Sequence, residues 1–269
     1  MPELPEVEVT RRGLAPQLAG RHISAVIVRE PRLRWPVPTE VRSLAGRTVR
    51  AVNRRGKYLL LDCGDGHLIV HLGMSGSLRL VPPGTPAQKH DHFDLVLGDR
   101  TLRLRDPRRF GAVLWTSKAP DTHPLLSGLG LEPLSPALAP KPLHALTRGS
   151  RVPVKQFLMD ARRIVGVGNI YASESLFRAG IHPRRRANRV SLKDCAKLAS
   201  AIKQTLRAAI RAGGSSLRDY VGADGVLGDF QSRTWVYARE GEPCRRCRTA
   251  IRRIVQAGRS SFYCPTCQR

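Results

Sequence analysis

Short hydrophobic runs separated by polar, glycine-containing turns fill residues 23–116. Runs of this length, rich in Val, Ile and Leu, are typical of β-strands. The dipeptides Asp-Gly at 65–66 and Gly-Asp at 98–99 lie between two such runs, where tight hairpin turns are expected. The predicted strands are ISAVIV, RTVRAV, KYLLLDC, HLIVHL, HFDLVL, TLRLRD and AVLW. This half of the chain is therefore expected to form antiparallel sheets, as a sandwich or a barrel.

Helical patterns flank this β-rich region. A helix is expected over residues 5–19, since Pro5 suits a first helical turn and Gly20 suits a helix end. In the second half of the chain, apolar or small residues recur every three or four positions, which indicates amphipathic helices. The predicted helices there are 154–162, 169–180 and 192–213. Together the two halves predict an α+β fold with a β-sandwich and a flanking helix at the N-terminus.

Changes in composition predict the domain boundaries. Six prolines fall within residues 117–150, which we interpret as a linker containing one helical turn at 143–148. Residues 213–234 are rich in glycine and are expected to form a loop around a short helix at 216–221. The expected domains are 1–116 for the sandwich, 117–150 for the linker, 151–234 for the helical domain and 235–269 for a separate C-terminal module.

The charge of the chain points to a polyanionic partner. The 269 residues contain 46 Lys plus Arg and 21 Asp plus Glu, a formal net charge of +25. Such an excess favours nucleic acid, because each neutralised phosphate releases a condensed counterion. No apolar run has the ~18–20 residues that a membrane helix needs, so no membrane partner is expected. The start, MPELPEVEVT, holds three acidic residues and no apolar segment, so no secretion signal is expected.

Four cysteines form a paired pattern at the C-terminus. Cys244 and Cys247 are separated by two residues, as are Cys264 and Cys267. Each pair can bind one side of a tetrahedral Zn²⁺, and the spacer is long enough for a two-stranded ribbon. Four thiolates fill the coordination shell, so one structural zinc ion is expected in place of two disulfides. The remaining cysteines, Cys63 and Cys195, are interpreted as small buried residues.

Several motifs in order along the whole chain resemble the bacterial formamidopyrimidine-DNA glycosylase family. They are MPELPEVEV, RRGKYLL, HLGMSGSL, KHDHFD, DPRRFG, VGVGNIYASESLFRAGIHP and the four-cysteine ribbon with GRSSFYC. The resemblance implies a β-sandwich joined to a helix–two-turn–helix domain and a zinc ribbon. It also implies a bifunctional base-excision repair enzyme, which removes oxidised purines such as 8-oxoguanine and formamidopyrimidines and then cleaves the abasic strand.

The resemblance places the catalytic amine at Pro2, exposed once Met1 is removed. An α-amino group of pKa near 8 is neutral in ~10–15% of molecules at pH 7, whereas a lysine is almost wholly protonated. A secondary amine attacking the sugar gives an iminium ion that cannot lose its charge by deprotonation, and so acts as an electron sink. Glu3 is implied as the acid–base residue. For Glu6, a catalytic role and simple compensation of the helix dipole stay open.

Two further catalytic residues are implied. Lys57 opens a predicted strand, and the family places it near the base as a proton donor in elimination. Arg259 follows the ribbon turn at Gly258, where a guanidinium can reach the scissile phosphate and stabilise charge on the leaving group. A lysine at a strand edge is usually only solvated, so the role of Lys57 depends on the resemblance.

Other residues are expected to contact DNA. Asn169 starts a helix after two glycines, where backbone amides can approach a phosphate, and Lys155 lies on the preceding helix. The resemblance pairs these two residues as a phosphate clamp. His71, His90 and Arg151 also align with DNA-contacting positions.

A flipped base leaves a gap that must be filled. Met74 and Phe110 are apolar residues beside glycines and suit insertion between base steps. Arg108 can donate to the unpaired base, and the resemblance groups these three residues as the set that fills the gap. Core packing is the alternative interpretation of Met74 and Phe110.

Two other functions are alternatives: an endonuclease VIII-like enzyme acting on oxidised pyrimidines, and a non-catalytic DNA-binding protein. The PELPEVE start, the RRF motif and the long 213–234 loop favour the purine enzyme, and the presence of Pro2, Glu3 and Lys57 argues against binding alone. The expected partner is double-stranded DNA that contains oxidised purines. A monomer located in the bacterial cytoplasm, at the nucleoid, is expected.

Overall fold

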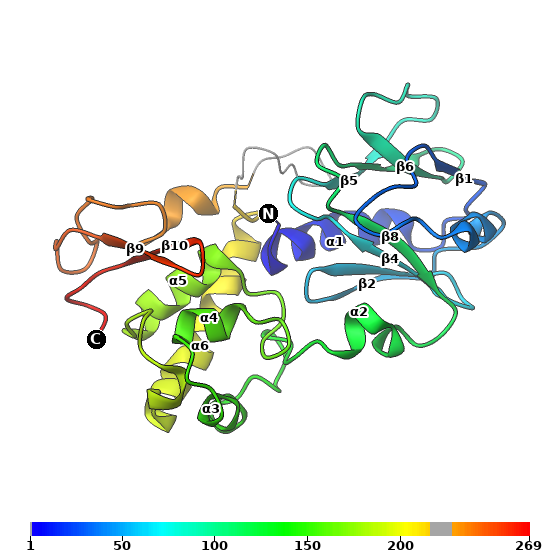
Figure 1. Ribbon diagram of the computed structural model, residues 1–269. Helices are drawn as coiled ribbons and strands as arrows, with labels where there is room; N and C mark the ends of the chain where they lie inside the picture. Colours follow the sequence, from blue (N-terminus) through cyan, green and yellow to red (C-terminus); the bar gives the residue numbers. More distant parts are fainter. Residues whose placement is uncertain (1, 216–227) are drawn as a thin grey trace. The chain divides into compact units, whose positions relative to one another are not determined.

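A computed structural model describes residues 2–215 and 228–269, and these form two compact units (Figure 1). The first unit comprises Met1–Gly128 with Ala212–Asp229, and the second comprises Leu129–Arg211 with Phe230–Arg269. These divisions differ from the expected ones, because the stretch expected as a linker contributes structure to both units. The short helix expected at 216–221 lies outside the described residues.

The described residues of the first unit form one long helix and eight strands. Helix α1 spans Leu4–Leu18, close to the predicted 5–19, with a proline in its first turn and Gly20 in a left-handed conformation just after its end. The strands are β1 (Ala25–Val28), β2 (Ala51–Arg55), β3 (Tyr58–Asp62), β4 (His67–His71), β5 (Ser77–Val81), β6 (Asp91–Val96), β7 (Thr101–Arg105) and β8 (Ala112–Thr116). A short helix α2 (Pro124–Ser127) and the 3-10 turns η1 (Thr39–Leu44) and η2 (Pro120–Thr122) also belong to this unit.

The strands form two four-stranded antiparallel sheets, in the orders β1-β6-β7-β5 and β2-β3-β4-β8. Six of the eight strands coincide with predicted runs, whereas β2 shares only Ala51 and Val52 with the run predicted at 47–52. The turns expected at 65–66 and 98–99 join β3 to β4 and β6 to β7. Strand β5 was not predicted, because its serine and arginine interrupt the hydrophobic pattern. This strand is defined by its pairing with β7, in which Leu78 lies opposite Leu104, and not by a pattern in its own sequence.

Alternate residues of both sheets point into one core. Leu59 and Leu61 of β3 and Leu102 and Leu104 of β7 are fully buried, as the two-residue period of a strand requires. Leu14 of α1 joins this core, because the helix packs against β2 and β3 of one sheet and β5 of the other. The expected β-sandwich with a flanking helix is confirmed, and its core fixes the position of the first residues of the chain.

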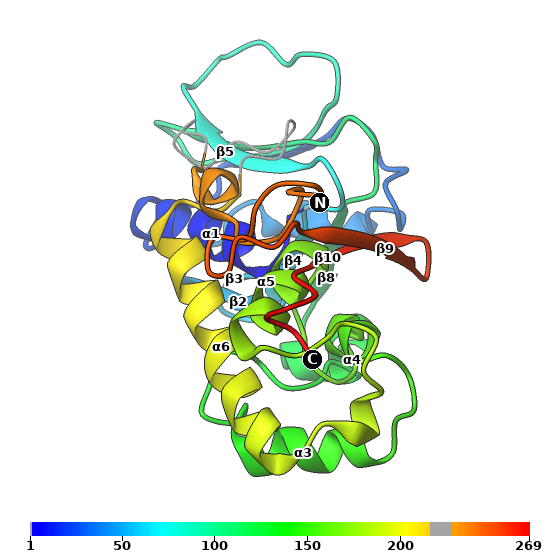
Figure 2. The ribbon, with the colours of Figure 1, turned by 90° about the vertical axis from the view of Figure 1, so that its left-hand side faces the viewer.

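The second unit is helical and ends in a two-stranded ribbon. Its helices are α3 (Pro140–Arg148), α4 (Val154–Met159), α5 (Asn169–Ala179) and α6 (Leu192–Arg211), with 3-10 turns η3 (Ala187–Arg189) and η4 (Phe230–Arg233). Figure 2 shows α6 as the long helix of this unit, and α3 and α5 pack against it. Helix α3 includes the helical turn expected at 143–148. In the described parts of the chain, no helix is long and apolar enough to cross a membrane.

Strands β9 (Arg252–Gln256) and β10 (Arg259–Tyr263) form the predicted ribbon. Ala257 and Gly258 make its two-residue turn, and both have positive φ (47° and 71°), the conformation that matches the twist of a hairpin. Strand β10 packs against α5. The turn places Arg259 at the first position of β10, opposite Gln256.

Candidate functional site

The first residues of the chain are held at the start of α1. Glu3 is the N-cap, and a capping box joins it to Glu6: the Glu3 backbone N–H donates to Oε2 of Glu6 at 2.8 Å, while the Glu3 carboxylate accepts from the Glu6 backbone. Pro2, Glu3 and Glu6 are all buried. The implied nucleophile and acid–base residue are therefore adjacent, on a backbone that the helix start orders.

Glu6 also binds a distant segment of the same unit. Its Oε1 accepts from the backbone N–H of Ser215 at 2.8 Å and from the Ser215 hydroxyl at 3.0 Å. A Cβ at Gly214, which has φ +85°, would lie 3.1 Å from that oxygen. The helix-dipole interpretation of Glu6 thus describes only part of its environment. One buried carboxylate connects the start of α1 to the residues that precede 216–227.

Lys57 lies in the two-residue turn between β2 and β3, one position before the strand it was expected to open. The side chain of Arg54 joins this turn to α1, donating to the carbonyl of Gly56 at 2.9 Å and to Oε2 of Glu8 at 3.0 Å. Burial alone would raise the pKa of Glu8, but hydrogen bonds from Arg11, Arg12 and Arg54 lower it to about 2. Glu8 is thus a permanent carboxylate at neutral pH. This link was not predicted, since Glu8 has no motif of its own.

His71 lies close to Lys57 in the sandwich. It ends β4 opposite Tyr58, and their ring centroids are 4.7 Å apart. Burial, followed by the charges of Lys57 and Arg34, lowers the pKa of His71 to about 4. The structure therefore brings Lys57, His71 and Arg34 together as two cations beside one neutral imidazole, an arrangement suited to an anionic ligand. Arg34 was not singled out from the sequence.

Met74 and Phe110 are exposed, as expected for residues that insert into DNA. Their exposed fractions are 38% and 43%, which excludes both from the core. The guanidinium of Arg108 lies 5.0 Å from the centre of the Phe110 ring, a cation–π contact. His90 lies in the turn before β6 with φ +77°, and its ring is 6.2 Å from that of His92. The three residues expected to fill the gap lie on exposed turns.

In the second unit, Lys155 and Asn169 are paired as expected. The Lys155 ammonium donates to Oδ1 of Asn169 at 2.6 Å, and to the carbonyl of Ser260 and the hydroxyl of Ser261 at 2.8 Å each. The Lys155 side chain is almost wholly buried. Asn169 is the first residue of α5, after Gly168. The pair therefore also connects α4 and α5 to β10 of the ribbon, and its contact with phosphate stays a prediction.

Arg259 and Lys155 line one pocket. It has a volume of about 180 Å³ and is bounded by the ribbon turn on one side and by Gln156, Met159 and Asp160 on the other. Arg259 is exposed to solvent, so its guanidinium is accessible to a DNA phosphate. Arg151 is also exposed, just before α4. The structure places both arginines where a DNA backbone can reach them, and their roles stay predictions.

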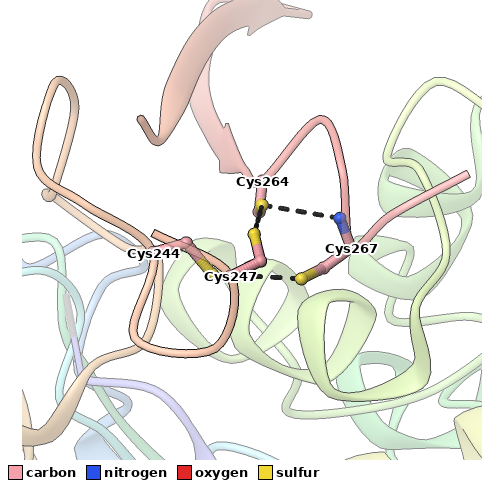
Figure 3. A group of neighbouring side chains, drawn as sticks. All are labelled: Cys244, Cys247, Cys264 and Cys267. Atoms are coloured by element: carbon pink, nitrogen blue, oxygen red, sulfur yellow. Dashed lines mark hydrogen bonds between the residues drawn. The ribbon is translucent and has the colours of Figure 1, made fainter. Parts of the chain in front are cut away.

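The four cysteines lie together in the C-terminal module. All four Sγ atoms lie within 4.8 Å of one another, with Cys247 and Cys264 at 3.4 Å and Cys244 and Cys267 at 4.0 Å (Figure 3). A tetrahedral site with Zn–S bonds of about 2.3 Å requires S···S separations of about 3.8 Å, so the set fits one zinc ion. No other cluster of metal-binding side chains occurs among the residues that the structure describes. Cys63 and Cys195 do not belong to this cluster, and both are buried, as predicted.

Glu174 anchors the zinc module to α5 and was not predicted. Its buried carboxylate accepts from three successive backbone N–H groups, those of Trp235, Val236 and Tyr237, at 2.9 to 3.0 Å. Burial raises the pKa of Glu174, and the three hydrogen bonds oppose that shift. Phe177, one turn further along α5, stacks on Trp235. The contact has no sequence signal, because its acceptor and donors are about 60 positions apart.

The sandwich, the helical unit and the four-cysteine ribbon, with a net charge of +25, define a zinc-containing DNA-binding protein. Three family models match in order: the formamidopyrimidine-DNA glycosylase N-terminal domain (residues 1–113), its H2TH domain (129–221) and the zinc finger found in FPG and IleRS (241–269). The chain belongs to the formamidopyrimidine-DNA glycosylase family. The sequence-based resemblance and the expected fold are confirmed.

Curated relatives match over the full length. The formamidopyrimidine-DNA glycosylase of Thiobacillus denitrificans is 62% identical and that of Herminiimonas arsenicoxydans 55% identical, each covering all of both chains. Among solved structures, the MutM (Fpg) protein of Thermus thermophilus is 42% identical with a TM-score of 0.90, covering 99% of this chain and 98% of its own. A Lactococcus lactis Fpg mutant bound to Fapy-dG-containing DNA is 35% identical, with a TM-score of 0.91 and full coverage of both chains.

Proposed function

We propose that this protein removes oxidised purines, including 8-oxoguanine and formamidopyrimidines, from double-stranded DNA and then cleaves the abasic strand. The observation that carries the proposal is the intact Pro2–Glu3 pair, buried at the capped start of α1 in a chain that belongs to this family throughout. A relative from Lactococcus lactis bound to Fapy-dG-containing DNA supports the substrate class. A binding protein would need neither the amine of Pro2 nor the carboxylate of Glu3.

The proposed chemistry uses the Pro2 amine once Met1 has been removed. Its lone pair forms a bond to C1′ of the damaged nucleotide, and the base departs with the electrons of the glycosidic bond. Glu3 protonates the opening sugar and, as a carboxylate, later accepts a proton back. The resulting iminium withdraws electrons from the sugar, which acidifies its neighbouring C–H groups, so that the 3′ and then the 5′ phosphate leave by β- and δ-elimination.

The other site residues assist this sequence. We assign Lys57 as proton donor in the first elimination, and Arg259 as the cation that stabilises the departing phosphate in the second. His71, His90, Arg151 and Asn169 contact the DNA backbone, and Lys155 supports that contact through its hydrogen bond to Asn169. Met74, Arg108 and Phe110 fill the gap left by the flipped nucleotide. The zinc ion supplies no chemistry in this scheme, since four cysteine ligands leave no position for water or substrate.

Borohydride trapping tests the covalent step. Wild-type protein incubated with an 8-oxoguanine:C duplex and borohydride should give a stable protein–DNA adduct, and its absence from active protein would remove the iminium proposal. Pro2→Gly should largely abolish cleavage, whereas Pro5→Ala, which changes a proline three residues on, should not. Wild-type rates for Pro2→Gly would contradict the requirement for a secondary amine at this position. Mass spectrometry should show that active protein lacks Met1.

A substrate panel separates the two enzymatic candidates. A Lactococcus lactis Fpg structure also contains DNA with an oxidised pyrimidine, which favours some activity on that class. Duplexes with 8-oxoguanine, formamidopyrimidine or thymine glycol should be cleaved fastest when the lesion is a purine. Preference for thymine glycol would instead support the endonuclease VIII-like candidate.

We further propose that the protein works as a monomer in the cytoplasm, at the nucleoid. All residues assigned above come from one chain. Light scattering should give the mass of one chain, free and bound to a lesion duplex, whereas a dimer mass on DNA would contradict the assignment.

A further inference from the structure

The two exposed apolar tips of the sandwich are carried by turns that are far apart in the sequence. Met74 lies in the turn between β4 and β5, closed by a hydrogen bond from the Gly76 N–H to the Leu72 carbonyl at 2.8 Å. Phe110 lies in the turn between β7 and β8. A tip that inserts between bases must resist the stacked bases it displaces, so each turn needs support from the protein.

One buried carboxylate, that of Asp106, binds both turns. Its Oδ1 accepts from the Ser75 hydroxyl at 3.2 Å, and its Oδ2 accepts from the Gly111 backbone N–H at 2.7 Å. Asp106 is fully buried and Ser75 nearly so. Each oxygen thus holds the residue directly after one of the exposed tips.

The backbone of Asp106 adds three more hydrogen bonds. Its carbonyl accepts from Nε2 of His92 at 2.9 Å and from the backbone N–H of Arg109 at 3.2 Å. Its own N–H donates to the carbonyl of His90 at 2.9 Å. The turn that carries His90, another residue assigned to DNA contact, is therefore attached to the same position.

The turns are in direct backbone contact. A Cβ on Gly73 would lie 2.4 Å from the carbonyl carbon of Phe110, and one on Gly111 would lie 2.7 Å from the carbonyl oxygen of His71. Gly73 also has φ +62°. Neither position can hold a larger residue without separating the turns, so the two backbones form one packed unit.

We propose that Ser75 and Asp106 are positioning residues that lock the Met74 and Phe110 turns into a single rigid wedge, and that this lock is required to extrude the damaged base. The proposal rests on the proposed function. Two turns that were not joined would each have to be ordered when DNA binds, which costs binding free energy. A displacement of about 1 Å at a tip is enough to reduce the rate of excision by up to a hundredfold. Because Ser75 and Asp106 are buried, they act through the tips and not by touching DNA.

Ser75→Ala is the decisive variant, since it removes only the hydroxyl that joins the two turns. Under single-turnover conditions we expect excision from an 8-oxoguanine:C duplex to fall roughly tenfold. Cleavage of a duplex with a preformed abasic site should stay within about twofold of wild type, because no base has to be unstacked. Ser75→Thr, which keeps the hydroxyl, should recover excision. Ser77→Ala, at another buried serine two residues further on, should match wild type in both assays.

A fluorescent base beside the lesion gives a readout that does not need catalysis. Binding of wild-type protein should unstack that base and raise its fluorescence, and Ser75→Ala should weaken the rise. Excision by Ser75→Ala at the wild-type rate would overturn the proposal. Equal loss of excision and of abasic-site cleavage, together with a lower Tm, would also overturn it, because that result would show a general structural role for Ser75. If wild-type protein excises no oxidised purine, the proposed function fails, whereas the fluorescence comparison still decides on the lock.

Discussion

The backbone N–H of Gly73 donates a hydrogen bond of 3.0 Å to Nδ1 of His71. A neutral imidazole that accepts at Nδ1 carries its proton on Nε2, so His71 can donate to a phosphate without being charged. Burial and the neighbouring cations Lys57 and Arg34 lower its pKa to about 4, which keeps this form at physiological pH.

We predict that His71 stays neutral from pH 8 to pH 5. The imidazole signals of His71, assigned by comparison with His71→Phe, should titrate with a midpoint near 4 in an NMR experiment. In the unfolded chain this imidazole binds a proton near pH 6.5, whereas in the folded protein it does so near pH 4. The free energy of unfolding is therefore not reduced by this group above pH 6.5, and it decreases as the pH falls from 6.5 towards 4. Wild type should therefore lose more stability than His71→Phe between pH 6.5 and 4.5. A midpoint near 6.5 would refute this prediction.

Glu6 gives a second prediction. Its buried carboxylate accepts from the Glu3 N–H and from two groups of Ser215. Glu6→Gln keeps the shape of the side chain but places an amide N–H₂ group against N–H or O–H donors. We expect the free energy of unfolding, measured in urea, to fall by about 1–3 kcal/mol. Excision should slow as well, because the start of α1 carries Pro2 and Glu3. Glu40→Gln, at an exposed glutamate, is the control. Unchanged stability and excision in Glu6→Gln would contradict both the hydrogen-bonding role and the helix-dipole role, because the variant also removes the charge.

Local patterns predicted most of the fold. The helix α1, six strands and the ribbon each have a signature within a few residues: a proline at a helix start, alternating hydrophobic residues, or a glycine turn. Strand β5 lacks such a signature, since it is defined by pairing with β7, whose residues are 20 to 28 positions away. The expected linker contains α3, whose proline-rich start looked like a loop but is compatible with a first helical turn.

The site was predicted only where motifs carry it. Pro2, Glu3 and the four cysteines could be named from their spacing and the family resemblance. The contacts that hold such residues in place join segments that are distant in sequence, as Glu174 does with Trp235 or Asp106 with Ser75. These partners belong to no sequence motif. Their roles depend on their burial and on their distances to other side chains, which only the folded structure shows.

The third prediction concerns metal content. Wild-type protein should contain one zinc ion per chain by atomic absorption, and Cys264→Ser should lose it because only three ligands remain. Affinity for DNA should also fall, since the ribbon that carries Arg259 packs against the module that the metal holds. Cys195→Ser changes a buried cysteine outside the cluster and should keep its zinc. Full zinc content in Cys264→Ser would contradict the assigned ligands.

Lys155 allows a structural role to be separated from direct contact with DNA. Its ammonium has three N–H donors, and Asn169, Ser260 and Ser261 accept from it at 2.6 to 2.8 Å. Lys155→Met leaves three acceptors near an apolar side chain, so we expect unfolding free energy to fall by about 3 kcal/mol. Lys193→Met, at an exposed lysine on α6, should have little effect on stability.

The salt dependence of binding then measures what Lys155 does for DNA. Loss of a direct phosphate contact lowers the slope of log K against log salt by about one. Because the hydrogen-bonding capacity of the Lys155 ammonium is used within the protein, we predict a smaller change for Lys155→Met at a temperature where the variant is folded. Arg151→Met, which removes an exposed cation before α4, should give the full change. A full unit lost in Lys155→Met would show that the lysine exchanges a protein acceptor for phosphate when DNA binds.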